Sequence, residues 1–125
     1  MKFPSLSILM ILTMASIHTM ASENEKQFTE KLDREYIQEV LAGKHHNVLS
    51  SREAVPSAQV AIDIAFSVWL PIYGAKSLEN QKPFHATRYD EYWFVTGTLK
   101  TQLGGVAEAV IRAKNGEVLN VSHGK

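Results

Sequence analysis

Apolar and polar positions alternate with a helical period over the first part of the chain and again in its middle. Residues 23–42 place apolar side chains at helical spacing among Glu, Lys, Asp, Arg and Gln. This pattern predicts an amphipathic helix whose single apolar stripe packs on another element. Gly43 is the expected residue just past the end of that helix.

The second helical segment is apolar around most of its circumference. Pro56 is expected at its first position, and Pro71 is expected to end it after about Leu70. Its polar side chains form one row, at Gln59, Asp63 and Ser67. A helix this apolar is predicted to be buried on most sides, so we expect it to be the core helix. Residues 44–55 before it form a polar connector.

From Pro83 onward the period changes to two, which is typical of strands. Four segments rich in β-branched and aromatic residues are predicted strands, at residues 83–89, 92–99, 106–113 and 117–122. Asp90 and Glu91 supply the first turn. Two helices followed by an antiparallel meander of about four strands indicate an α+β layer structure.

The register of the last hairpin follows from the apolar pattern. A two-residue Asn115-Gly116 turn would mix apolar and polar side chains on each face. A loop of residues 114–116 instead pairs Ala113 with Glu117 and Ile111 with Leu119, and places Gly116 at the positive φ of a bulge. That register predicts a clean core face of Ala107, Ala109, Ile111, Leu119 and Val121.

The opposite face of the predicted sheet is mixed in character. In the second strand, Trp93, Val95 and Leu99 are expected to face the core helix. The other face then carries Tyr92, Phe94, Thr96, Thr98, Glu108, Val110, Arg112, Val118, Asn120 and Ser122. Aromatic and arginine side chains dominate the energy of protein interfaces, which favours partner binding. The alternative is a solvated face that the first helix partly covers.

The composition indicates a small single-domain protein and argues against some classes of partner. A chain of 125 residues holds one domain with a modest core, and its formal net charge of zero argues against nucleic-acid binding. The chain has no cysteine, so it has neither a disulfide nor a lipoprotein anchor.

The first 21 residues are predicted to be a secretory signal peptide. Lys2 supplies the positive start, residues 6–14 are almost wholly apolar, and residues 19–21 fit a cleavage site after Ala21. The alternative is a membrane anchor, but a span needs about 20 consecutive apolar residues. We therefore expect a periplasmic protein with no membrane contact beyond the cleaved signal. Residues 22–54 would be the N-terminal helix and connector, and residues 55–125 the folded domain.

Candidate chemistry is sparse. His45 and His46 are neighbours in an expected loop and cannot easily chelate one ion together. Ser122 and His123 point to opposite faces of a strand, so they cannot form a dyad. Gly104-Gly105 precedes a strand and not a helix, which indicates the start of a strand and not a phosphate loop. The sequence predicts no metal site and no cofactor.

Two carboxylates leave open the alternative that the protein is a catalyst. Asp63 lies on the polar row of the core helix, and Glu108 on the mixed sheet face. Burial beside an aromatic ring would raise the pKa of such a carboxylate and suit it to act as a general base. It could equally accept hydrogen bonds from a loop or from His85.

Several ordered motifs resemble the NTF2-fold immunity protein family. They are WLPIYG at residues 69–74, QKPF at 81–84, YWFVTGTL at 92–99 and the terminal hairpin at 104–125, so that the resemblance covers residues 55–125. It implies a cystatin-like α+β fold in which a sheet wraps a helix. It also implies a role in bacterial polymorphic toxin systems, where an immunity protein binds and neutralises a cognate toxin. The family pattern implies no catalytic residue.

We therefore expect a periplasmic immunity protein, not an enzyme, that binds its toxin non-covalently. The predicted contact residues are Tyr92, Phe94, Leu103, Gly104, Gly105, Glu108, Arg112, Asn120, His123 and Lys125. The alternative is a small-molecule-binding or isomerase-like NTF2-fold protein of the cell envelope, with Asp63 or Glu108 as the polar group of its pocket. A third interpretation is an envelope scaffold that assembles with itself. The oligomeric state is left open.

Overall fold

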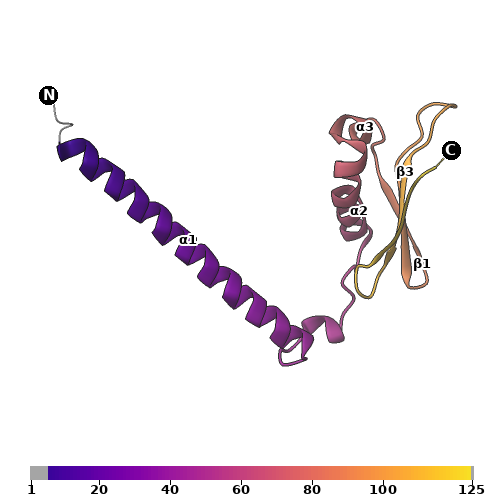
Figure 1. Ribbon diagram of the computed structural model, residues 1–125. Coiled ribbons are helices and arrows are strands. Elements are labelled where there is room, and N and C mark those ends of the chain that lie inside the picture. Colours follow the sequence, from indigo (N-terminus) through magenta and orange to yellow (C-terminus); the bar gives the residue numbers. More distant parts are fainter. Residues whose placement is uncertain (1–5, 125) are drawn as a thin grey trace. The chain divides into compact units, whose positions relative to one another are not determined.

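The structure is a computed structural model that describes residues 6–124, with side chains described at position 17 and from position 19 onward (Figure 1). The chain divides into two units, Met1–His46 and Asn47–Lys125, each of which is described by itself. Lys2 of the predicted signal and the predicted contact residue Lys125 lie outside the described residues.

The first unit is a single helix. The helix α1 spans Leu6–Leu41, so it contains the predicted amphipathic segment but begins within the predicted signal peptide. It ends as expected before Gly43, whose φ is +71°. The described apolar stripe of this helix is exposed at Phe28, Leu32, Tyr36, Ile37 and Val40, and the His45 ring lies 4.8 Å from that of Tyr36. No helix among the described residues combines the length and apolar character needed to cross a membrane.

The core helix differs from the prediction at both ends. The helix α2 spans Ala58–Tyr73, and the Ser57 hydroxyl caps it by accepting the Val60 N–H at 3.3 Å. Pro56 therefore lies outside the helix, because a serine side chain supplies the cap. Pro71 lies inside the last turn, where the missing N–H removes one hydrogen bond without ending the helix. The helix ends instead at Gly74, with φ of +82°.

Only one face of α2 is fully buried, so the prediction of burial on most sides is wrong. Ala61, Ala65 and Trp69 are completely buried, whereas the predicted polar row at Gln59, Asp63 and Ser67 is exposed. The apolar side chains between these faces are half-buried against the core, at Val60, Ile62, Ile64 and Phe66. The reason is that the sheet lies on one side of the helix only (Figure 1).

The rest of the second unit is a short helix and a four-stranded antiparallel sheet. A 3-10 turn, η1, spans Val48–Ser50, and the helix α3 spans Ala75–Glu79. The strands are β1 at His85–Tyr89, β2 at Tyr92–Thr96, β3 at Ala107–Arg112 and β4 at Val118–His123, in the order β1-β2-β3-β4. The predicted α+β fold, with a core helix on a four-stranded meander, is confirmed.

Two residues lie on the other side of the core boundary from their predicted place. Leu99 is 51% exposed and not in the core, because β2 stops at Thr96 and the chain leaves the sheet. Val55 was assigned to the polar connector but is completely buried. Its carbonyl oxygen accepts the Trp93 Nε1–H at 2.9 Å, and its N–H donates to Ala113 O at 3.0 Å. The core therefore begins before α2.

The last hairpin follows the predicted register at one end only. Ala107 faces His123 and Ala109 faces Val121 as expected, but Ile111 pairs with Val118 and not with Leu119. The loop is longer than predicted, because the Arg112 N–H donates to Glu117 O and residues 113–116 close the turn. A bulge absorbs the extra residue, so that Val118 packs on the core and Leu119 is 42% exposed. Gly116 has the expected positive φ, +76°.

Gln81 is the buried polar residue that ties the end of α3 to the sheet. Its Oε1 accepts the Ala107 N–H at 2.7 Å, and its Nε2 donates to Ser77 Oγ at 3.2 Å. Its backbone oxygen accepts the Thr98 N–H at 2.7 Å. A Cβ at Gly97 would lie 2.8 Å from Gln81 Oε1, so the glycine makes room for this side chain.

Replacing Gln81 by Leu is expected to lower the free energy of unfolding by about 1–3 kcal/mol, because the buried Ala107 N–H loses its acceptor. Ser77→Ala is the matched control, since it removes only the bond at the exposed end of the same side chain and should change stability by about 0.5 kcal/mol or less. Urea unfolding followed by tryptophan fluorescence measures both. Equal effects of the two substitutions would contradict the role given to Gln81 Oε1.

Candidate functional site: the open face of the sheet

One face of the sheet is left uncovered by the second unit. Figure 1 shows α2 and α3 on the same side of the sheet. The strand registers place three rows of side chains on the other side. We call this surface the open face; its residues are His85, Thr87, Tyr89, Tyr92, Phe94, Thr96, Glu108, Val110, Arg112, Asn120 and Ser122.

Arg112 is the best-anchored cation on the open face. Its Nε lies 3.2 Å from Glu117 Oε2, and its Nη1 lies 3.3 Å from both Glu91 Oε2 and the Tyr92 hydroxyl. Its guanidinium carbon is 5.2 Å from the centre of the Tyr92 ring. The hydrogen bond to Glu117, followed by that to Tyr92, raises the pKa of Arg112 above its ordinary value. The side chain is thus a permanent cation whose position is fixed before any partner arrives.

Two further aromatic side chains, Phe94 and Tyr89, lie on the same face as that cation. Phe94 is 40% exposed in the middle row, where it lies between Thr87 of β1 and Val110 of β3. Tyr89 is 75% exposed and pairs with Tyr92 across the β1–β2 turn. The sequence analysis does not name Tyr89 as a contact residue. The turn that it predicts at Asp90 and Glu91 nevertheless implies that Tyr89 pairs with Tyr92.

The third row holds Thr96, Glu108 and Ser122, and a chain of polar groups links it to Asn120 of the middle row. The Ser122 hydroxyl donates to Glu108 Oε2 at 3.1 Å, and Asn120 Nδ2 donates to Ser122 Oγ at 3.3 Å. Five of the predicted contact residues therefore lie on one surface: Tyr92, Phe94, Glu108, Arg112 and Asn120. Val118, which was assigned to this face, lies on the core side instead because of the bulge.

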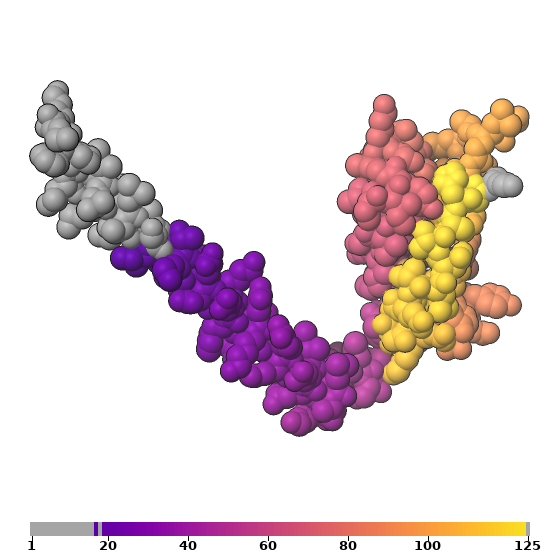
Figure 2. All heavy atoms as spheres, in the orientation of Figure 1, coloured from indigo at the N-terminus to yellow at the C-terminus, as the bar shows by residue number. Residues whose placement is uncertain are grey.

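The other described contact residues lie at the end of the sheet and not on the open face. Leu103 is 90% exposed on the loop after β2, which Figure 2 shows projecting from the second unit in orange. Gly104 has φ of +126°, and a Cβ at Gly105 would lie 1.4 Å from Gly124 O. The His123 ring lies 5.6 Å from that of Tyr73. The glycines thus permit a close backbone approach where β3 begins, in agreement with the prediction.

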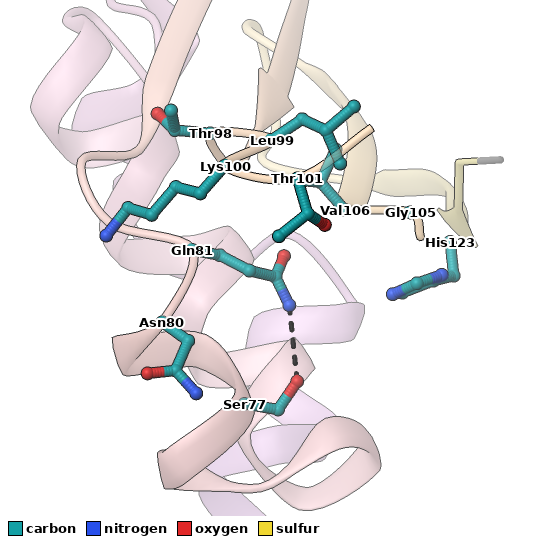
Figure 3. A pocket seen from close by; sticks show the side chains of 10 residues that line it. All are labelled: Ser77, Asn80, Gln81, Thr98, Leu99, Lys100, Thr101, Gly105, Val106 and His123. Atoms are coloured by element: carbon teal, nitrogen blue, oxygen red, sulfur yellow. Dashed lines mark hydrogen bonds between the residues drawn. The ribbon is translucent and has the colours of Figure 1, made fainter. Parts of the chain in front are cut away.

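A polar groove opens at this end of the sheet (Figure 3). It has a volume of about 440 Å³. Figure 3 shows Gln81 and its bond to Ser77 on one side and the His123 ring on the other. Its lining consists of Ser77, Asn80, Gln81, Thr98, Leu99, Lys100, Thr101, Gly105, Val106 and His123. The two carboxylates considered for catalysis, Asp63 and Glu108, are not among these residues.

Asp63 lacks the buried surroundings proposed for a general base, whereas Glu108 is half-buried and accepts a hydrogen bond from the Ser122 hydroxyl. Asp63 is exposed and accepts a hydrogen bond from Gln59 Nε2 at 2.8 Å, not from His85. His85 Nε2 lies 3.1 Å from the Thr98 hydroxyl. Within the described residues, no group of three or more His, Cys, Asp or Glu could hold a metal ion. The exposed aromatic rings and the anchored Arg112 of the open face suit the binding of a partner.

An ion pair between Arg88 of β1 and Glu53 lies on the core side of the sheet. Arg88 Nη1 lies 3.0 Å from Glu53 Oε2 and Nη2 lies 2.8 Å from Oε1, a two-point contact. The guanidinium carbon is 5.5 Å from the centre of the Trp93 ring. The hydrogen bond from Arg88 lowers the pKa of Glu53 below its ordinary value of 4.5.

This lowered pKa predicts a pH dependence of stability. A carboxylate with a depressed pKa in the folded state stabilises the fold above the pKa of the unfolded chain and loses that contribution as the pH falls through the folded-state value. Thermal unfolding of the wild type and of Glu53→Gln should therefore differ at neutral pH and converge in acid below pH 4.5. A difference in melting temperature that stays constant down to pH 3 would contradict the ion pair.

Comparison with known proteins identifies the protein family of this chain. A model of the NTF2 fold immunity protein family matches residues 60–125. The chain belongs to this family. The matched segment contains all four strands and most of α2, so the open face and the groove lie within the family domain and α1 lies outside it.

The chain is also similar to a curated protein. The chain is 32% identical over 76 residues to uncharacterized protein YhhH of Escherichia coli K12, a match that covers 59% of this chain and 60% of that protein. The alignment thus spans less than two thirds of the relative. No solved structure matches the chain.

Proposed function

We propose that this immunity protein neutralises a cognate bacterial toxin by direct, non-covalent binding, and that the open face is the contact surface. The observation that carries the proposal is that exposed Tyr89 and Phe94 share one sheet face with Arg112. The Arg112 guanidinium is held by Glu91, Glu117 and Tyr92. Aromatic and arginine side chains are the common anchors of protein interfaces.

The rigidity of this face supports the same proposal. The anchors stand on paired strands and not on loops, and Arg112 is held in place before binding. Less side-chain entropy is then lost on association, which leaves more of the contact energy as affinity. Immunity by occlusion needs a binding surface and no chemistry of its own.

The experiment uses the product of the adjacent gene as the candidate toxin. Its expression should arrest growth, and co-expression of the immunity protein should restore growth and yield a complex that co-purifies. Growth restored without any complex between the purified proteins would contradict inhibition by direct binding. Growth that is not restored would contradict the immunity pairing itself.

We also propose that the protein is exported to the periplasm. The apolar segment at residues 6–14 and the small residues before position 22 support cleavage after Ala21. Cell fractionation with N-terminal sequencing should find a periplasmic form that begins at Ser22. Leu9→Arg, which interrupts the apolar segment, should retain the uncleaved chain in the cytoplasm. An uncleaved wild-type chain in the cytoplasm would contradict export.

The groove favours a second candidate, the binding of a small molecule. Its volume of about 440 Å³ falls in the range of ligand sites, and hydroxyl, amide and cationic groups line it. A polar metabolite library screened by thermal shift tests this function. Stabilisation lost in Lys100→Ala would support it, whereas a complex with the toxin and no stabilising compound would favour immunity alone.

A further inference from the structure

The strand β4 forms an edge of the four-stranded sheet, with part of its backbone facing away from β3. The Gly124 N–H donates to Val106 O at 2.8 Å, and the register pairs Glu108 with Ser122 and Val110 with Asn120. The Gly97 N–H donates to Ala107 O, so odd-numbered residues of β3 bond to β2 and even-numbered ones to β4. The N–H and C=O groups of Val121 and His123 consequently point away from β3, toward the free edge.

The two edges of the sheet are not protected alike. Of the two outward positions in β1, Ala86 and Arg88, the second carries a charge and is paired with Glu53. In contrast, β4 has the sequence VLNVSH, which holds no Lys, Arg, Asp, Glu or Pro. Charged residues and prolines are the usual means by which edge strands avoid further pairing. Leu119 on this strand is 42% exposed.

The sequence of β4 is also complementary to itself. An antiparallel pair with Val121 facing Val121 of the second copy places Asn120 opposite Ser122 and Leu119 opposite His123. The amide and hydroxyl meet on the open-face side, the valines meet on the core side, and no like charges face each other. We propose that β4 pairs in this way with a second copy of the chain, which joins two sheets into one across a two-fold axis at Val121.

Such a dimer would also change the binding surface. A two-fold axis perpendicular to the sheet keeps both open faces on the same side, so the two copies form one continuous surface. Dimerisation through β4 does not depend on toxin binding, and each proposal can fail without the other.

Proline scanning of the two edges tests this pairing. Val121→Pro removes an N–H that points to the free edge and takes no part in the β3 ladder. Sedimentation of protein purified from the full-length coding sequence should show a dimer whose dissociation constant rises at least about tenfold in this variant. Ala86→Pro is the matched control, because Ala86 has the same outward orientation on β1; it should leave the dimer unchanged. A monomer at all micromolar concentrations, or equal effects of the two prolines, would overturn the proposal.

A cross-linking experiment tests the same β4 pairing in case the Val121→Pro variant does not fold. The chain has no cysteine, so Val121→Cys introduces a single thiol. Directly opposite Cβ atoms in an antiparallel pair lie about 5 Å apart, within reach of a short bismaleimide. We expect a covalent dimer from Val121→Cys and none from Ala86→Cys. No covalent dimer from Val121→Cys, or equal yields at the two positions, would overturn the proposal.

Discussion

Replacing Trp69 by Ala is expected to lower the free energy of unfolding by about 3–5 kcal/mol, the largest effect of any single substitution considered. Trp69 is completely buried, its ring centre lies 5.6 Å from that of Phe84, and its Nε1 donates to Glu108 O at 3.3 Å. The substitution therefore opens a cavity between α2 and the sheet and removes a hydrogen bond to β3. Urea unfolding followed by the remaining Trp93 fluorescence measures the loss.

Leu70→Ala is the matched control for that experiment. Leu70 is the next residue of α2 but is 39% exposed, so its truncation should cost about 1 kcal/mol or less. Trp69→Phe should fall between the two, because it keeps most of the apolar volume and loses the bond to Glu108 O. A loss in Trp69→Ala no greater than that in Leu70→Ala would contradict the packing of α2 on the sheet.

Toxin affinity should fall about 30-fold when either Phe94 or Arg112 is replaced by Ala, in keeping with about 2 kcal/mol for a central anchor. Phe94 would lose its exposed ring from the middle row, and Arg112 its fixed guanidinium. The two residues lie close on the same face, so their effects are not expected to add. Titration calorimetry with the purified toxin domain measures both.

Asp63→Ala and Ser67→Ala are the controls for toxin affinity. Both residues lie on the exposed row of α2, on the opposite side of the molecule from the open face. They should leave affinity unchanged within about twofold, since surface substitutions away from an interface have small effects. If these variants lose affinity and Phe94→Ala does not, the toxin binds the helical side.

The sequence was sufficient to predict the strands and most of the open face, because alternation at Tyr92, Trp93, Phe94 and Val95 determines which side chains share a face. It was not sufficient for the end of the last hairpin. There the Arg112–Glu117 closure adds a loop residue, and a bulge exchanges Val118 for Leu119 on the core side. Asn-Gly marks a turn but does not say how many residues close it.

Other differences come from tertiary context. Pro71 does not end α2, since its position in the last turn costs a single hydrogen bond. The apolar side chains around most of α2 predict that the helix is buried on most sides. Only one sheet packs against α2, so only one face of the helix is fully buried. The predicted site residues are divided between an open face and a groove because of the path of the loop after β2. Residues 100–105 of that loop give no periodic signal from which its path could be predicted.

The central claim is that the open face contacts the toxin, and site-specific photo-cross-linking tests it most directly. A benzophenone amino acid placed at Phe94 should form a covalent adduct with the toxin domain on irradiation, and one placed at Asp63 should not. Mass spectrometry of the adduct would then identify the toxin segment that lies over Phe94. A toxin adduct from position 63 and none from position 94, in proteins that both form the complex, would contradict the account.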